Sequence, residues 1–289
     1  MNTTELISSI KLKGAFPDDD YFTTTEYLTI LNESLQTQVL PLMLQLSEEY
    51  LLQDKDYTIS SSAVYRIPKR AIGAKLRDVK VYDSSGNYTN LYRLVEEDRS
   101  SNNTGYYISR NKIELSSSIT SGTLRLTYFL QPPTLVATSS CGQITSIDTN
   151  NNQVVVSSAP STFITDAEVD IIQNSNPHDV ISFENTISAI SGTTITFNST
   201  LPSDLTVGDW VCISGQAPVA LIPTELENVL VQSALCLCLS AKKDKSVEFE
   251  TQKLEQLKNT MINLLDPRVE SGNDNKFRGS GLLGYIQNR

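Results

Sequence analysis

The stretch Thr23–Leu52, TTTEYLTILNESLQTQVLPLMLQLSEEYLL, is the longest segment of this chain with helical periodicity. Thr23 and Glu26 have the spacing of a capping box, in which side chains satisfy the unpaired N–H groups of the first helical turn. Pro41 lacks an N–H group and crowds the carbonyl of Thr37, so a kink is expected there. We therefore predict a long, kinked helix whose apolar face carries Tyr27, Leu31, Leu35, Val39, Leu42, Leu46 and Tyr50.

Downstream of this helix, polar and apolar residues alternate as they do in strands, until helical periodicity returns after Pro223. The predicted fold class is α+β: an α-helical core, made of the long kinked N-terminal helix and two C-terminal helices, with a β-sheet region and a β-barrel-like or sandwich-like insertion. The expected parts are an N-terminal arm at 1–22, a helical and β core at 23–136 and 215–266, a β insertion at 137–214, and a flexible C-terminal tail at 267–289.

The expected insertion contains a weak internal repeat with an offset of about 42 residues, a pattern typical of structures built from two related halves. Val154–Val156 matches Ile195–Phe197, and Glu168–Ile171 matches Asp209–Cys212. Short strands separated by turn residues favour a small barrel or sandwich. The competing interpretation is chance similarity between strands that are rich in Ser and Thr.

The formal net charge of −10 and the isoelectric point near 4.7 argue against an ordinary nucleic-acid-binding surface. Such surfaces need clustered Lys and Arg to neutralise phosphates. The stretch Arg66–Lys75, RIPKRAIGAK, is a candidate for a local basic patch. The competing interpretation is a solvated turn and strand.

The chain shows no sustained apolar stretch of the kind that forms a secretory signal or a membrane-spanning helix, so neither is expected. The cysteines show no metal-binding spacing. We expect buried free thiols in a protein made in a reducing cytoplasm, at Cys141, Cys212, Cys236 and Cys238.

No convincing active site, cofactor site or metal site emerges from the sequence. Gly279–Gly284 reads G-x-G-x-x-G, but no strand precedes it and too little chain follows for the helix that this motif requires. His178, the only histidine, adjoins Asp179 in a polar loop and makes a poor base–orienter pair. Asp18–Asp20 contains three acidic residues that could bind a cation, although a solvated turn is the simpler interpretation.

Four stretches carry a resemblance to a known family: Tyr27–Tyr50 (YLTILNESLQTQVLPLMLQLSEEY), Arg66–Val79 (RIPKRAIGAKLRDV), Gly208–Pro223 (GDWVCISGQAPVALIP) and Leu264–Val269 (LLDPRV). Together with the expected order of kinked helix, β region, returning helices and free tail, they are similar to the head–tail adaptor (connector or neck) proteins of tailed bacteriophages. The β insertion departs from the minimal helical adaptor.

This resemblance implies a structural virion protein, not an enzyme, made in the bacterial host cytoplasm and located at the head–tail interface. Adaptors of this kind form a ring, typically twelve-fold, beneath the portal protein and above a downstream tail or nozzle protein. Genomic DNA passes through the ring without sequence-specific binding, and no membrane is involved. An acidic channel wall would not hold the passing DNA.

The C-terminal tail is polar except for a few apolar residues near its end. We expect these residues to anchor the tail in the portal protein, as a mobile segment does when it docks on a partner. They are Phe277, Leu282, Leu283, Tyr285 and Ile286.

Two other classes of function stay open. In the first, the protein is a carbohydrate-binding or receptor-binding virion protein that uses the β insertion, with Trp210 and Phe197 as the main aromatic candidates. In the second, it is a hydrolase that uses Asp and Glu residues, although no pair of carboxylates stands out.

Overall fold

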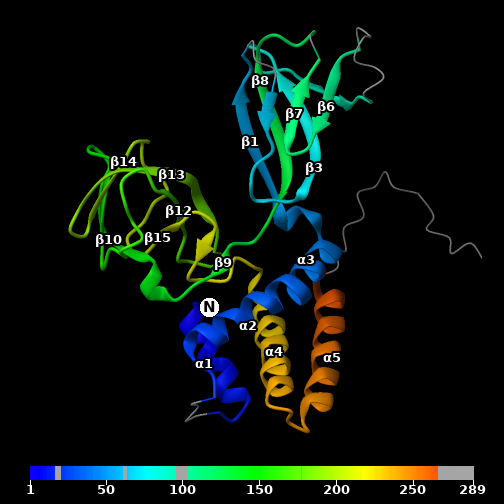
Figure 1. The fold of residues 1–289 in the computed structure, drawn as a ribbon, viewed down its shortest axis with the longest axis vertical. Helices are drawn as coiled ribbons and strands as arrows, with labels where there is room; N and C mark the ends of the chain where they lie inside the picture. Colours follow the sequence, from blue (N-terminus) through cyan, green and yellow to red (C-terminus); the bar gives the residue numbers. More distant parts are fainter. Residues whose placement is uncertain (17–20, 61–63, 96–102, 117, 177, 266–289) are drawn as a thin grey trace, which may run out of the picture.

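A computed structural model describes residues 1–16, 21–60, 64–95, 103–116, 118–176 and 178–265 of the chain. A layer of helices lies at one end, two facing sheets rise from it, and a closed barrel lies beside both (Figure 1). The helices are α1 Thr3–Lys13, α2 Thr24–Ser34, α3 Leu40–Leu46, α4 Thr224–Ala241 and α5 Val247–Leu265. Shorter helical segments are the π-helical η1 Leu35–Val39 and the 3₁₀ turns η2 Glu48–Leu51 and η4 Thr138–Ser140.

Strands dominate the described residues, where sixteen of them form four sheets. The predicted fold class is therefore wrong, because the protein is mostly β and is not an α-helical core built on one long N-terminal helix. The sandwich sheets have the orders β1-β8-β3-β4 and β2-β7-β6-β5, the barrel has the order β10-β11-β14-β13-β12-β15, and β16 pairs with β9. The strands are β1 Leu52–Thr58, β2 Val64–Arg66, β3 Ala71–Tyr82, β4 Tyr88–Asn90, β5 Tyr92–Arg93, β6 Gly105–Ser109, β7 Lys112–Leu115, β8 Thr123–Leu130, β9 Thr134–Leu135, β10 Gly142–Asp148, β11 Gln153–Val156, β12 Glu168–Ile172, β13 Val180–Ser191, β14 Thr194–Phe197, β15 Trp210–Ile213 and β16 Gln216–Ala217.

The predicted long helix begins as expected but divides into three consecutive helical segments, α2, η1 and α3, and ends at Leu46. Thr23 and Glu26 form the capping box, in which the Glu26 N–H donates to Thr23 Oγ1 at 3.3 Å. Pro41 cannot donate a helical hydrogen bond, and the turn before it widens into the π-helical η1. After α3 the backbone turns extended at Ser47, with φ −158° and ψ 126°, and Leu52 already starts β1.

Helix α1 occupies much of the range 1–22 that was predicted as an N-terminal arm. Asn2 and Glu5 form a capping box at its start, which sequence reading overlooked because the helix is short and its apolar face is narrow. The Thr3 N–H donates to the Pro218 carbonyl at 2.8 Å, so α1 is fastened next to β16.

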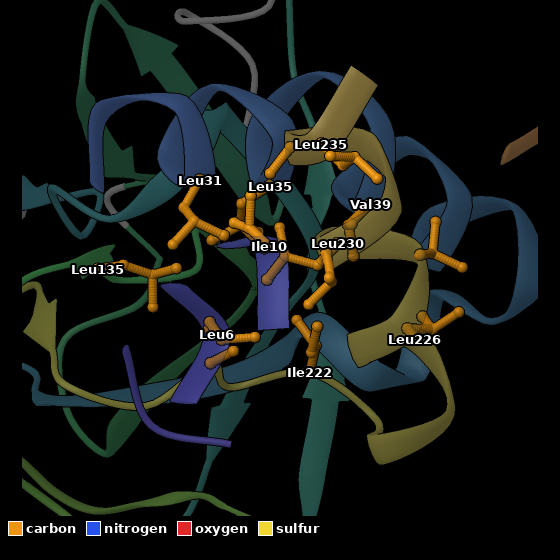
Figure 2. Packing of buried hydrophobic residues seen from close by; sticks show 14 of the residues in the cluster. Leu6, Ile10, Leu31, Leu35, Val39, Leu135, Ile222, Leu226, Leu230 and Leu235 are labelled. Atoms are coloured by element: carbon orange, nitrogen blue, oxygen red, sulfur yellow. The ribbon is translucent and has the colours of Figure 1, made fainter. Parts of the chain in front are cut away.

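The helical segments α1, α2, η1, α3, α4 and α5 contribute buried residues to one apolar core, part of which is drawn in Figure 2. Figure 2 shows Leu6 and Ile10 of α1 facing Leu230 of α4, with Leu31 of α2 and Val39 of η1 closing the core from the other side. The predicted apolar face of the N-terminal helical stretch is buried from Tyr27 to Leu46, but Tyr50 lies outside the helix and is 47% exposed.

The two β units have separate cores. One core lies between the two sandwich sheets and includes Leu126 of β8 and Ile113 of β7. The barrel core is built from two related halves, as the sequence repeat predicts. The repeat matches β11 to β14 and β12 to β15, and each of these matched strands pairs antiparallel with its counterpart, with Val154 opposite Ile195.

Asn32 of α2 joins the helical layer to β9, the strand that leads into the barrel. Its Oδ1 accepts the N–H of Leu135 at 2.7 Å, and its Nδ2 donates to the carbonyl of Leu135 at 2.9 Å. Both backbone groups of Leu135 are thus satisfied by one side chain. Leu135 is only 2% exposed, so water cannot easily replace these bonds.

We expect Asn32→Ala to lower the free energy of unfolding by about 1–3 kcal/mol, because it leaves two buried backbone groups without partners. Urea unfolding followed by far-UV circular dichroism would measure the change. Thr29→Ala, at an exposed position of the same helix, is the matched control and should change stability by less than about 0.5 kcal/mol. Equal effects of the two substitutions would contradict a role for Asn32 in holding β9.

Candidate functional site

A cleft of about 190 Å³ lies between the sandwich and the barrel. One wall comes from β1 and from the Ile67–Arg70 turn between β2 and β3. The other wall comes from Glu168 of β12 and from Phe183 and Glu184 of β13. We call this region, where sandwich, barrel and β16 meet, the junction.

Arg70 and Asp170 form the centre of the junction. Arg70 Nη1 lies 2.6 Å from Asp170 Oδ2, and their side chains are 15% and 1% exposed. The carboxylate also accepts the N–H of Glu184 at 2.9 Å on Oδ1 and the N–H of Gly215 at 2.9 Å on Oδ2. One buried carboxylate thus joins the β2–β3 turn, the barrel hairpin and the chain leaving the barrel. Such a group is stable only because a cation and several donors surround it.

A second ion pair lies at the rim of the same cleft. Lys55 Nζ of β1 is 3.0 Å from Glu184 Oε2, and both side chains are about one-third exposed or more. The Arg70 guanidinium lies over the Phe183 ring, 5.5 Å from its centroid. Burial, assisted by the charge of Glu184, raises the pKa of Tyr128 to about 12, so its hydroxyl stays neutral at physiological pH.

Two of the stretches that carry the family resemblance meet at the junction, and a third is linked to it through β9, although all three are far apart in the sequence. Asn32, in the first stretch, holds β9, and β9 pairs in parallel with β16 in the third. The N–H of Gly215, just before β16, reaches the Asp170 carboxylate that binds Arg70 of the second stretch. The fourth stretch begins at the end of α5 and lies mostly outside the described residues.

The junction has the chemistry of a structural joint. Its buried carboxylate is occupied by an arginine and by backbone donors, so it is not available as a general base. Across the described ranges, no group of three or more His, Cys, Asp or Glu residues is placed to hold a metal ion. In the same part of the chain, no helix is long and apolar enough to cross a membrane.

His178 and Asp179 do not form a catalytic pair. His178 Nδ1 contacts the carbonyl of Gln173 at 3.2 Å, while Asp179 Oδ1 accepts the N–H of the next residue, Val180, at 2.7 Å. Burial lowers the pKa of His178. The pair therefore shapes a loop, as the simpler interpretation of the sequence held.

Several other predicted positions can be placed. Trp210 and Phe197, the candidates for sugar stacking, are 9% and 3% exposed, and Trp210 Nε1 donates to Asn174 Oδ1 at 3.0 Å, so neither ring offers a free face. All four cysteines are free and buried, as predicted. The candidate cation site at Asp18–Asp20, the glycine motif at Gly279–Gly284 and the tail residues Phe277, Leu282, Leu283, Tyr285 and Ile286 lie outside the described residues.

Sequence reasoning missed Asp170 as the partner of Arg70. A signal was present, because Asp170 stands in the apolar strand EVDII where the other half of the repeat has Val211. A charge in one half of a repeat, at a position that is apolar in the other half, indicates a contact that only one half makes. No protein-family model matches this chain, and no curated protein matches it.

Proposed function

We propose that this protein is a structural component of a phage virion, a head–tail adaptor that binds the portal protein and assembles with copies of itself into a ring. In this role it sits between the portal and a downstream tail or nozzle protein. The ring, typically twelve-fold in adaptors of this kind, continues the DNA channel.

The observation that carries the proposal is that two resembling stretches meet at the junction and a third is linked to it through β9. Arg66–Val79 supplies the arginine and Gly208–Pro223 supplies a backbone donor. Tyr27–Tyr50 holds β9 through Asn32, and β9 pairs with β16 of the Gly208–Pro223 stretch. Stretches that share contacts in this way maintain the relative orientation of helices, sandwich and barrel. A ring-forming subunit needs this rigidity, because small errors in orientation accumulate around a closed ring.

The surface of α5 also supports assembly. Within the described residues of this helix only Leu254 is fully buried, while Phe249 and Leu264 are 59% and 61% exposed. Most of the helix is therefore available to neighbouring copies or to the portal. The acidic balance of the chain suits a channel that DNA must traverse without being held.

Native mass spectrometry of the purified protein, alone and mixed with its portal protein, tests the proposal. We expect a low-order species alone and a ring of many copies on the portal. A monomer or trimer that ignores the portal would contradict the proposal and would favour a binding protein that acts through the barrel.

Truncation after Val269 tests the predicted tail anchor. We expect the truncated protein to keep its unfolding midpoint, because the described core ends at Leu265, and to lose portal binding. A full-length variant with the five apolar tail residues changed to Ser should behave in the same way. Normal portal binding by both variants would exclude the tail as the anchor.

A further inference from the structure

A basic cluster lies at the base of the sandwich, next to the junction. Arg66 and Lys69 from the β2–β3 turn, with Arg110 and Lys112 from the β6–β7 hairpin, surround a hollow of about 660 Å³. The remaining lining residues, Ile67, Ser109 and Asn111, carry no charge. The hollow is thus lined by cations and by neutral donors, without an acidic residue, in a protein whose net charge is −10.

These four cations differ from Arg70 and Lys55 in having no ion-pair partner among the described residues, although Arg66 and Lys69 also border the junction cleft that contains Glu168 and Glu184. Arg70 is bound to Asp170 and Lys55 to Glu184, so the cations that hold the junction are neutralised. None of the four cluster side chains forms an ion pair with another residue of the described ranges. All four are exposed and can therefore reach a ligand in solution.

The cluster is unfavourable for the isolated fold. Arg66 and Lys112 stand directly opposite each other on β2 and β7, and like charges in that position destabilise a strand pair. Arg110 occupies the hairpin turn with φ 55°, a left-handed conformation that favours glycine or asparagine. These cations lower the stability of the strand pair and of the turn, so packing within the fold does not explain them. Binding of an anionic ligand would explain them.

We propose that this cluster is a phosphate-binding site that contacts the backbone of nucleic acid without reading its sequence. Arg and Lys side chains are the usual donors to phosphate oxygens, and the Ser109 hydroxyl and the Asn111 amide add neutral donors. The absence of aromatic residues from the lining disfavours base stacking. The site would give local, weak contact with a passing duplex, while the acidic remainder of the surface prevents tight retention.

The test measures binding of a labelled duplex of random sequence to the full-length protein by fluorescence anisotropy. The salt concentration is varied from about 25 to 150 mM, because phosphate contacts weaken as salt rises. The cluster variant R66Q/K69Q/R110Q/K112Q is compared with R77Q/R93Q/K243Q/K245Q, which removes the same charge from exposed positions elsewhere. We expect the cluster variant to bind at least about 10-fold more weakly, with the slope of log K against log salt reduced by roughly 3, and the control variant to stay near wild type.

A second variant separates binding from folding. Arg110→Gly removes one cation and also removes the backbone strain of a side-chain-bearing residue with φ 55°. It should therefore weaken duplex binding while raising the unfolding midpoint. A site kept for structural reasons would give the opposite change in stability. Inorganic phosphate, used as a competitor, distinguishes a site for free phosphate from one for the duplex backbone.

The duplex-binding measurements decide the proposal without the portal protein, so it can fail while the adaptor role stands. The proposal is overturned if both quadruple variants weaken duplex binding equally. It is also overturned if the wild-type protein does not bind the duplex at about 25 mM salt, where screening of charges is weak. Displacement of the duplex by inorganic phosphate at micromolar concentration would assign the site to free phosphate. Failure of the cluster variant to bind the portal, with duplex binding unchanged, would assign the cluster to an acidic protein surface instead.

Discussion

Arg70→Met is expected to lower the free energy of unfolding by about 3–5 kcal/mol, the largest effect of any single side chain at the junction. The substitution leaves the carboxylate of Asp170, whose side chain is 1% exposed, without its cation. Two backbone N–H groups remain as donors but cannot compensate a buried charge. Trp210, the only tryptophan, lies in the barrel, so its fluorescence during urea unfolding reports on the barrel, which loses its ion pair with Arg70.

A double-mutant cycle with Asp170→Asn identifies the cause. The double variant no longer buries an unpaired charge, so its loss of stability should be smaller than the sum of the two single losses by about 1–3 kcal/mol. Lys55→Met, which breaks the exposed pair at the rim of the same cleft, is the matched control and should cost at most about 1 kcal/mol. If Arg70→Met costs no more than Lys55→Met, the junction is held by something other than this ion pair.

Leu230→Ala is expected to cost about 2–5 kcal/mol, because it opens a cavity where α1, α2 and α4 meet (Figure 2). Leu230 is fully buried. Leu and Ala have similar helix propensities, so the loss reports packing and not the intrinsic stability of α4. Far-UV circular dichroism during urea unfolding follows the helices.

Leu264→Ala is the control for this prediction, since the same substitution at a side chain that is 61% exposed should change stability by less than about 0.5 kcal/mol. Comparing the dichroism and fluorescence transitions of Leu230→Ala adds a further test. Coincident shifts mean that helices and barrel unfold together. A dichroism shift without a fluorescence shift would show that the barrel unfolds on its own.

The sequence by itself determined the local features of this protein. The Thr23–Glu26 capping box sets the start of α2. The repeat offset matched strands that do pair as equivalents in the barrel. These features depend on residues close together in the chain, or on two copies of one pattern, so periodicity and turn chemistry are sufficient to locate them.

Only the tertiary structure decided how the parts are arranged. Sequence periodicity continues through Pro41, but the backbone widens into the π-helical η1 and leaves the helix at Ser47. The helical stretch is therefore shorter than predicted, and the rest of the protein is mostly β. Arg70 reads as one of several basic residues in RIPKRAIGAK, yet folding turns it toward an aspartate 100 positions away. Arg66 and Lys69 gain Arg110 and Lys112 as neighbours for the same reason. Such contacts arise from the packing of distant strands, and no local pattern encodes which of them will meet.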